Sequence, residues 1–174
     1  NMELPKQFET AGLLIDGAVW FRRVVEVPET WSGKDLVLNL PSIDDYDVTY
    51  FNGIKIGSIA RETPNSYMVA RQYVVPGTLV HAGANVIAIR VFDSGGEGGF
   101  SRGGKFSLGP ATAAESELIS LRGAWQYKVE LALEPKHPDW GSRPDAVGVN
   151  NQNNPSVLYN AMIAPLVRFP IRGV

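Results

Sequence analysis

A hydrophobic pattern of period two recurs along most of this chain, and it restricts the fold more than any other feature. In residues 19–27, Val19, Phe21 and Val25 share one face of the pattern, while Arg22 lies on the other. Similar segments follow at near-regular spacing: 36–40, 48–51, 67–75, 85–92, 105–108, 118–121 and 125–133. About eight short strands with no amphipathic helix between them predict an all-β fold, namely an antiparallel β-sandwich.

The dipeptide Asn52-Gly53 is the strongest local turn signal. Both residues accept a positive φ, so a two-residue turn can join residues 48–51 to a strand that contains Ile54 and Ile56. Residues 41–45 break the alternation before this hairpin. We therefore expect the preceding strand to end near residue 40.

The cleanest alternation, in residues 125–133, predicts a strand with one face on the core. Its apolar positions are Trp125, Tyr127, Val129, Leu131 and Leu133. Trp20 also lies in a predicted strand, and we expect both of these tryptophans in the core. An alternative is a sugar-stacking platform built from the four tryptophans of the chain: Trp20, Trp31, Trp125 and Trp140.

Composition excludes several classes of partner and site. With 16 basic and 18 acidic residues, the formal charge is -2, and no basic stripe with interleaved aromatics is present, so nucleic acid is not an expected partner. No apolar run approaches the ~20 residues of a membrane span, so we expect no membrane partner either. The chain has no cysteine, which excludes disulfides and thiolate metal sites. We predict no cofactor.

The periodicity ends after residue 133, and the chain divides there. We predict a β-sandwich at residues 1–134, a linker rich in Pro, Gly, Asn and Asp at 135–153, and a tail at 154–174. The length of 174 residues suits one domain with such an appendage.

The tail has the pattern of a short C-terminal helix. Asn154 can cap a helix that begins with Pro155, and Leu158, Met162 and Leu166 follow at intervals of four on one stripe. A lone helix of this kind has little of its own core to cover. We therefore expect a weakly held tail whose natural partner lies beyond this chain.

Two stretches resemble known carbohydrate-active enzymes. The segment Trp20 to Gly53 is similar to the galactose-binding-like jelly-roll domain of family two glycoside hydrolases such as β-galactosidase and β-glucuronidase. Residues 155–166, with the sequence PSVLYNAMIAPL, and residues 171–174 resemble the sialate O-acetylesterase family. In that family, a jelly roll of this type is inserted into an SGNH-type hydrolase domain.

The resemblance implies a non-catalytic piece of a larger enzyme. The parent would remove O-acetyl groups from sialic acid or related sugars, and its serine, acid and histidine blocks match no residue here. It also implies the rest of the hydrolase domain as a partner, an O-acetylated sugar as a second candidate partner, and a periplasmic or secreted location. Two alternatives remain open: an independent carbohydrate-binding module, and an accessory domain of a family two glycosidase.

One short motif suggests catalysis but lacks the expected context. Gly99, Ser101 and Gly103 match the Gly-x-Ser-x-Gly pattern of a nucleophile elbow, which requires a helix directly after a strand. Here the motif lies in a loop between two predicted strands. The only histidines, His81 and His137, are expected on the surface, so we assign no catalytic residue.

The same loop, residues 93–104, is the candidate ligand site. It contains six glycines, which let backbone approach a neighbour closely, and it carries polar and stacking side chains. The candidate ligand-binding residues are Asp93, Glu97, Phe100 and Arg102. The alternative is a reversal without a ligand.

Three acidic residues beside a strand start raise the question of calcium. Asp44, Asp45 and Asp47 carry the oxygen ligands that calcium prefers. Aspartates at such positions more often accept hydrogen bonds within a turn. We therefore predict no metal site.

Overall fold

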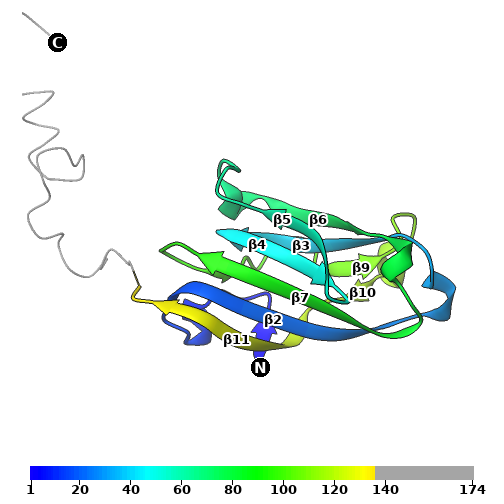
Figure 1. The fold of residues 1–174 in the computed structure, drawn as a ribbon, viewed down its shortest axis with the longest axis horizontal. Coiled ribbons are helices and arrows are strands. Elements are labelled where there is room, and N and C mark those ends of the chain that lie inside the picture. The colour runs from blue at the N-terminus through cyan, green and yellow to red at the C-terminus, as the bar shows by residue number, and fades with distance from the viewer. Residues whose placement is uncertain (136–174) are drawn as a thin grey trace, which may run out of the picture. The chain divides into compact units, whose positions relative to one another are not determined.

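Eleven strands build two antiparallel sheets in residues 1–135, the part of the chain that the computed structural model describes (Figure 1). The predicted all-β antiparallel sandwich is thereby confirmed. Residues 136–174 lie outside the described residues, and with them most of the predicted linker and the whole predicted helical tail. Within residues 1–135, no helix has the length and apolar character needed to cross a bilayer.

The larger sheet has six strands. In spatial order they are β1 (Met2–Leu4), β11 (Gly123–Leu133), β2 (Asp16–Val27), β7 (Gly83–Asp93), β4 (Tyr46–Phe51) and β5 (Ile54–Ile59). Every pairing is antiparallel. The central pair β2 and β7 stays in register from Gly17 opposite Asp93 to Val27 opposite Gly83.

The smaller sheet covers one face of the larger one. Its strands, in order, are β10 (Ile119–Ser120), β9 (Ser107–Gly109), β3 (Leu36–Asp44) and β6 (Ala70–Val75), and β8 (Gly99–Phe100) pairs with the end of β3. Short 3-10 turns connect strands: η1 (Glu9–Ala11), η2 (Glu29–Trp31), η3 (Ser66–Met68), η4 (Gly77–Leu79) and η5 (Glu115–Glu117).

The core lies between the inner faces of the two sheets, because the period-two pattern gives each strand one apolar side. Val19 and Phe21 of β2, Ile89 of β7 and Leu38 of β3 are fully buried there. The ring of Phe21 packs edge-on against Phe100 at 5.2 Å. Each such side chain contributes about 1.5–3 kcal/mol to folding through the area that it removes from water.

The predicted hairpin is confirmed. Asn52 and Gly53 both have positive φ, of 48° and 83°. The amide of Asn52 also links the turn to the beginning of β7, since it donates to Asn85 at 2.9 Å and accepts from the backbone of Val86 at 2.7 Å.

Strand boundaries differ most from the prediction at the end of β3 and, by three residues, at the start of β6. β3 does not end at Leu40 but runs to Asp44, because a register shift between Leu40 and Ser42 lets the strand pass Pro41 and continue its pairing with β6 and β8. β6 begins at Ala70, since the three residues 66–68 form a 3-10 turn.

The two strand tryptophans have different environments. Trp125 is in the core as predicted, with 1% of its surface exposed and its indole N–H donating to the Leu121 carbonyl. The same prediction for Trp20 is wrong, because residue 20 alternates with Val19 and Phe21 and so points to the outer face of the larger sheet.

The outer half of β11 also departs from the prediction. Tyr127, Leu131 and Leu133 retain 40%, 42% and 39% of their surface, although their alternation with Trp125 suggested core contact. A register shift between Val129 and Leu131 breaks the alternation before Leu131 and Leu133, whereas Tyr127 stays in register opposite Phe21 and is only partly covered.

A buried ion pair ties both sheets together. Arg71 of β6 donates to Asp47 of β4 at 2.8 Å, and both side chains are inaccessible to solvent. The remaining guanidinium N–H groups are used by four backbone carbonyls, those of Ser66, Val69, Ile43 and Asp45. The second Asp47 oxygen accepts hydrogen bonds from Thr49 and Tyr73, each at 2.9 Å. Burial of the Tyr73 hydroxyl and the negative charge of Asp47 beside it raise the pKa of Tyr73.

We expect Arg71→Met to lower the free energy of unfolding by about 3–5 kcal/mol, because it leaves the Asp47 charge buried without its partner. Urea unfolding measures this loss. Arg61→Met, at an exposed arginine, is the matched control and should change stability by less than about 0.5 kcal/mol. A loss of under 1 kcal/mol for Arg71→Met would show that the pair is not needed.

Candidate functional site

The outer face of the six-stranded sheet carries a group of aromatic and basic side chains. Strand register places them in two rows that cross β11, β2, β7 and β4 in turn: Gln126, Arg22, Ala88 and Tyr50 in one, and Lys128, Trp20, Arg90 and Val48 in the other. Side chains that lie opposite one another on one face of a sheet are close enough to touch. The sheet therefore assembles a surface from four strands.

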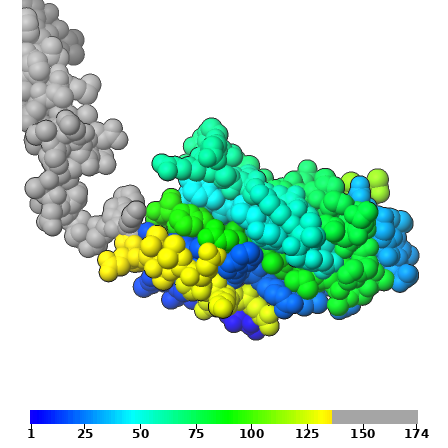
Figure 2. All heavy atoms as spheres, viewed as in Figure 1, coloured from blue at the N-terminus to red at the C-terminus, as the bar shows by residue number. Residues whose placement is uncertain are grey.

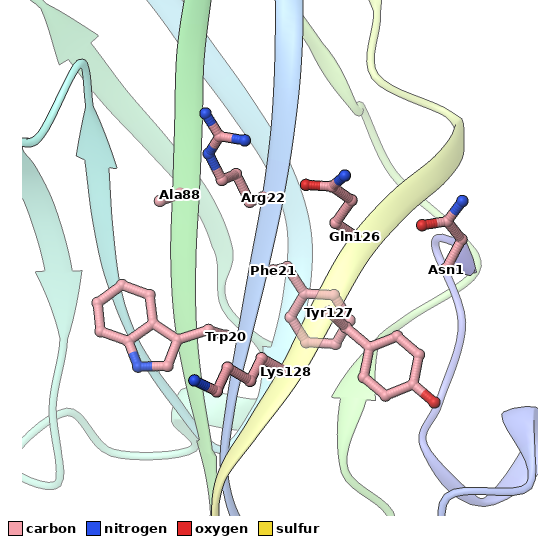
Figure 3. Close-up of a pocket in the computed structure, with 8 residues that line it drawn as sticks. All are labelled: Asn1, Trp20, Phe21, Arg22, Ala88, Gln126, Tyr127 and Lys128. Atoms are coloured by element: carbon pink, nitrogen blue, oxygen red, sulfur yellow. The ribbon is translucent and has the colours of Figure 1, made fainter.

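A cleft of about 510 Å³ opens on this face (Figure 3). Ala88 lies between Arg22 and Tyr50 in its row, and its methyl group fills little of the space between these longer side chains. The residues at the cleft are Asn1, Trp20, Phe21, Arg22, Ala88, Gln126, Tyr127 and Lys128. Phe21 and Tyr127 lie opposite one another, and their rings point to the other side of the sheet. The cleft is open to solvent, and we refer to it below as the β2–β11 cleft.

The indole of Trp20 is held at two points. Its N–H donates to Glu130 at 2.6 Å, and its ring lies 5.6 Å from that of Tyr50. Arg90 holds the same carboxylate through two hydrogen bonds, at 2.7 and 2.8 Å. The hydrogen bonds from Arg90 and Trp20 lower the pKa of Glu130, so this carboxylate stays ionised and keeps the indole oriented.

A second hollow of about 310 Å³ lies over β4, β5 and β7 on the same sheet. Lys55, Arg61 and Arg90 contribute to its lining, and the rings of Tyr46 and Phe92 stack at 6.4 Å beside it. Figure 2 shows β11 in yellow and the β4–β5 hairpin in cyan, with β7 in green between them. Aromatic and basic groups thus extend along this sheet beyond the β2–β11 cleft.

The four predicted ligand residues of the glycine-rich loop do not form one surface. Glu97 and Arg102 are exposed, and Glu97 accepts a hydrogen bond from Gln7. Asp93 is fully buried, with one oxygen accepting from Gly95 at 2.8 Å. Phe100 is fully buried between Phe21 and Phe106, which corrects the expectation of a stacking ring on the loop surface.

Several carboxylates lie close together around this loop. Burial of the carboxyl raises the pKa of Asp93 to about 7 despite the hydrogen bond from Gly95, and the charges of Asp16 and Glu9 add to the effect. Burial, with a hydrogen bond and charge from Asp45, raises the pKa of Asp44 to about 7. Each of these two carboxyls therefore binds a proton more readily in the folded state than in the unfolded chain.

The aspartates considered for calcium accept hydrogen bonds instead. Asp45 accepts from the amide and the hydroxyl of Ser94, and Asp47 is the partner of Arg71. In the described part of the chain, no three or more His, Cys, Asp or Glu side chains converge with the geometry of a metal site.

Ser101 lacks the surroundings of a nucleophile. Its hydroxyl accepts a hydrogen bond from Ser42 at 2.9 Å, and the chain continues to β9 without the helix that an elbow requires. His81, the one histidine within residues 1–135, lies instead at 3.2 Å from the Asn52 amide beside the β4–β5 turn. No serine–histidine pair forms among the described residues.

Sequence reasoning missed the β2–β11 cleft. Arg22 and Lys128 were on the polar side of their alternation, which identifies an outer face but not which strands are neighbours. In β4 the polar residues Asp47 and Thr49 are instead on the buried side, so the pattern there gave no sign that Tyr50 faces outward. One signal was available in the sequence. Trp20 and Arg22 are two residues apart in one strand, so both side chains lie on the same face of the sheet. A tryptophan that shares an outer face with charged side chains is a candidate for a binding surface, because tryptophan is enriched at interfaces.

We expect Asp93→Asn to stabilise the protein at high pH. The folded-state pKa of Asp93 is raised from its ordinary value to about 7, so the wild-type protein loses stability as the pH rises from about 4 to 7. Asparagine mimics the neutral carboxyl, and the variant should gain up to about 4 kcal/mol at pH 8 and little at pH 4. Urea unfolding of both proteins between pH 4 and pH 8 measures this difference in stability.

Glu62→Gln, at an exposed carboxylate, is the control for that series and should show no such pH-dependent gain. A constant difference between Asp93→Asn and wild type at every pH would contradict the assigned titration.

No protein-family model matches the chain, and no curated protein sequence does. Among solved structures, a β-glucuronidase from an uncultured Clostridium sp. is 21% identical, with a TM-score of 0.44 over 54% of this chain and 16% of that enzyme. A β-glucuronidase from Ruminococcus gnavus is 20% identical, with a TM-score of 0.40 over 47% of this chain and 13% of the enzyme. The matched part is thus a small share of each enzyme, and likeness at this level assigns no family.

Proposed function

We propose that this chain is a non-catalytic accessory domain of a larger carbohydrate-active hydrolase and that it binds sugar in the β2–β11 cleft. The observation that carries the proposal is the joint presence, in an open cleft, of an oriented indole and of the side-chain donors of Arg22, Gln126 and Lys128. Sugars have apolar C–H faces and polar hydroxyl edges. An aromatic ring flanked by hydrogen-bond donors complements both.

The chemistry of the cleft supports binding rather than catalysis. Glycoside hydrolysis ordinarily needs two carboxyl groups on opposite sides of the scissile bond, and the side chains that line the β2–β11 cleft include none. The nearby Glu130 already binds Trp20 and Arg90. Ester hydrolysis by a serine needs a base within hydrogen-bond reach, and Ser101 instead accepts a hydrogen bond from Ser42.

For the parent enzyme, we propose a sialate O-acetylesterase. The support is the resemblance of residues 155–166 and 171–174 to that family, in which a jelly roll interrupts the hydrolase domain. A second candidate is a family two glycosidase, which the segment Trp20 to Gly53 favours. The protein sequence encoded after Val174 separates them, since a Gln-Gly-Glu block supports the esterase and a barrel strand the glycosidase.

We expect calorimetry of the full chain against a panel of sialosides, galactosides and xylo-oligosaccharides to detect binding of at least one sugar. Trp20→Ala should weaken that binding by about tenfold, because the stacking surface is lost. Tyr67→Ala, at an exposed aromatic side chain on η3, is the matched control and should bind as wild type does. Equal affinity of the Trp20 and Tyr67 variants for the sugar would show that the sugar binds outside the β2–β11 cleft.

We expect no turnover of an acetyl ester by this chain alone, and no effect of Ser101→Ala in that assay, since Ser101 has no base beside it. Release of acetate from p-nitrophenyl acetate above the buffer rate is the measurement. Turnover that Ser101→Ala abolishes would overturn the non-catalytic assignment.

A further inference from the structure

We infer that the β2–β11 cleft selects sugars that carry a carboxylate, with Arg22 and Lys128 as the groups that bind it. The inference rests on the proposed sugar-binding function and concerns the class of ligand. It starts from the position of these two cations on adjacent strands at the edge of one cleft.

The two cations are diagonal neighbours on one face of the sheet. Arg22 of β2 lies opposite Gln126, and Lys128, two residues further along β11, lies opposite Trp20. Diagonal positions of this kind are about 7–8 Å apart, which long side chains can span. In Figure 3 the Arg22 guanidinium and the Lys128 ammonium point away from each other, so an anionic group contacts both only after one of these exposed side chains changes rotamer.

Neither cation is neutralised by a described residue. The ion pair on this face joins Arg90 to Glu130, and in residues 1–135 neither Arg22 nor Lys128 takes part in one. The chain as a whole has a formal charge of -2, so the excess of positive charge is a local property of the cleft. Local positive charge attracts anions and is reduced by salt.

The fixed carboxylate of Glu130 sets the direction in which an acidic sugar can lie. Glu130 accepts the indole N–H of Trp20, so the end of the indole that carries this N–H already faces a negative charge. A ligand carboxylate is repelled there and attracted toward Arg22, whose planar guanidinium can bind it through two parallel hydrogen bonds. The sugar ring then lies over Trp20, and the amide of Gln126 can bind a hydroxyl.

The test compares trigalacturonate with its fully methyl-esterified form, because esterification removes the charge and keeps the ring and hydroxyl pattern. Calorimetry of the full chain at 50 mM and 300 mM NaCl should show at least tenfold tighter binding of the acid at low salt, and a smaller difference at high salt. Arg22→Gln and Lys128→Gln should each weaken binding of the acid by about five- to tenfold and leave the ester unchanged.

Both variants replace exposed side chains, so folding should survive, and thermal unfolding checks this. Lys105→Gln is the control, since it removes one exposed positive charge outside the β2–β11 cleft.

Equal affinity for acid and ester would overturn the charge selection while leaving sugar binding in place. Binding of neither, with no binding of neutral sugars, would overturn the proposed function too. Dextran sulfate that binds as tightly as trigalacturonate, with the same loss in both variants, would show a general polyanion surface and also overturn the inference.

Discussion

The pairing of β2 with β7 is the constraint on which the rest of the structure depends. Along these two strands, alternate residues face opposite sides of the larger sheet, so one register decides both what is buried and what is presented. Phe21 and Ile89 lie opposite one another in the core, while Trp20 and Arg90 lie opposite one another outside. A slip of one residue would exchange the two sets, which would expose the core and bury the charges.

On the outer face of the larger sheet, Trp20 is fixed in its orientation, whereas Arg22 and Lys128 are free to bind. Trp20 is held by Glu130, and Glu130 by Arg90, so the orientation of the indole does not have to be set when a ligand arrives. Arg22 and Lys128 have no ionic partner among residues 1–135 and remain available. Preorganised groups lose less conformational freedom on binding, and free charges provide discrimination. This division suits a site that binds without reacting.

The alternation of single strands predicted most of the fold, because it is a local property. Residues 19–27 and 85–92 are strands, and the Asn52-Gly53 turn closes a hairpin. The strands β1 and β8 were missed, since two or three residues carry no period and exist through pairing with β11 and β3. The cleft depends on which strands are neighbours, and the burial of Phe100 depends on distant aromatic partners. Neither can be seen in one segment.

Ala88 has a consequence for how such a domain can diversify. Its neighbours Ile87 and Ile89 face the interior, whereas Ala88 is the smallest member of a row that spans four strands. A bulkier side chain there would make the cleft shallower without touching the interior packing. Single substitutions at position 88 can thus change the depth of the β2–β11 cleft at little cost in stability, and under the proposed function they would change the size of the sugar that the cleft admits.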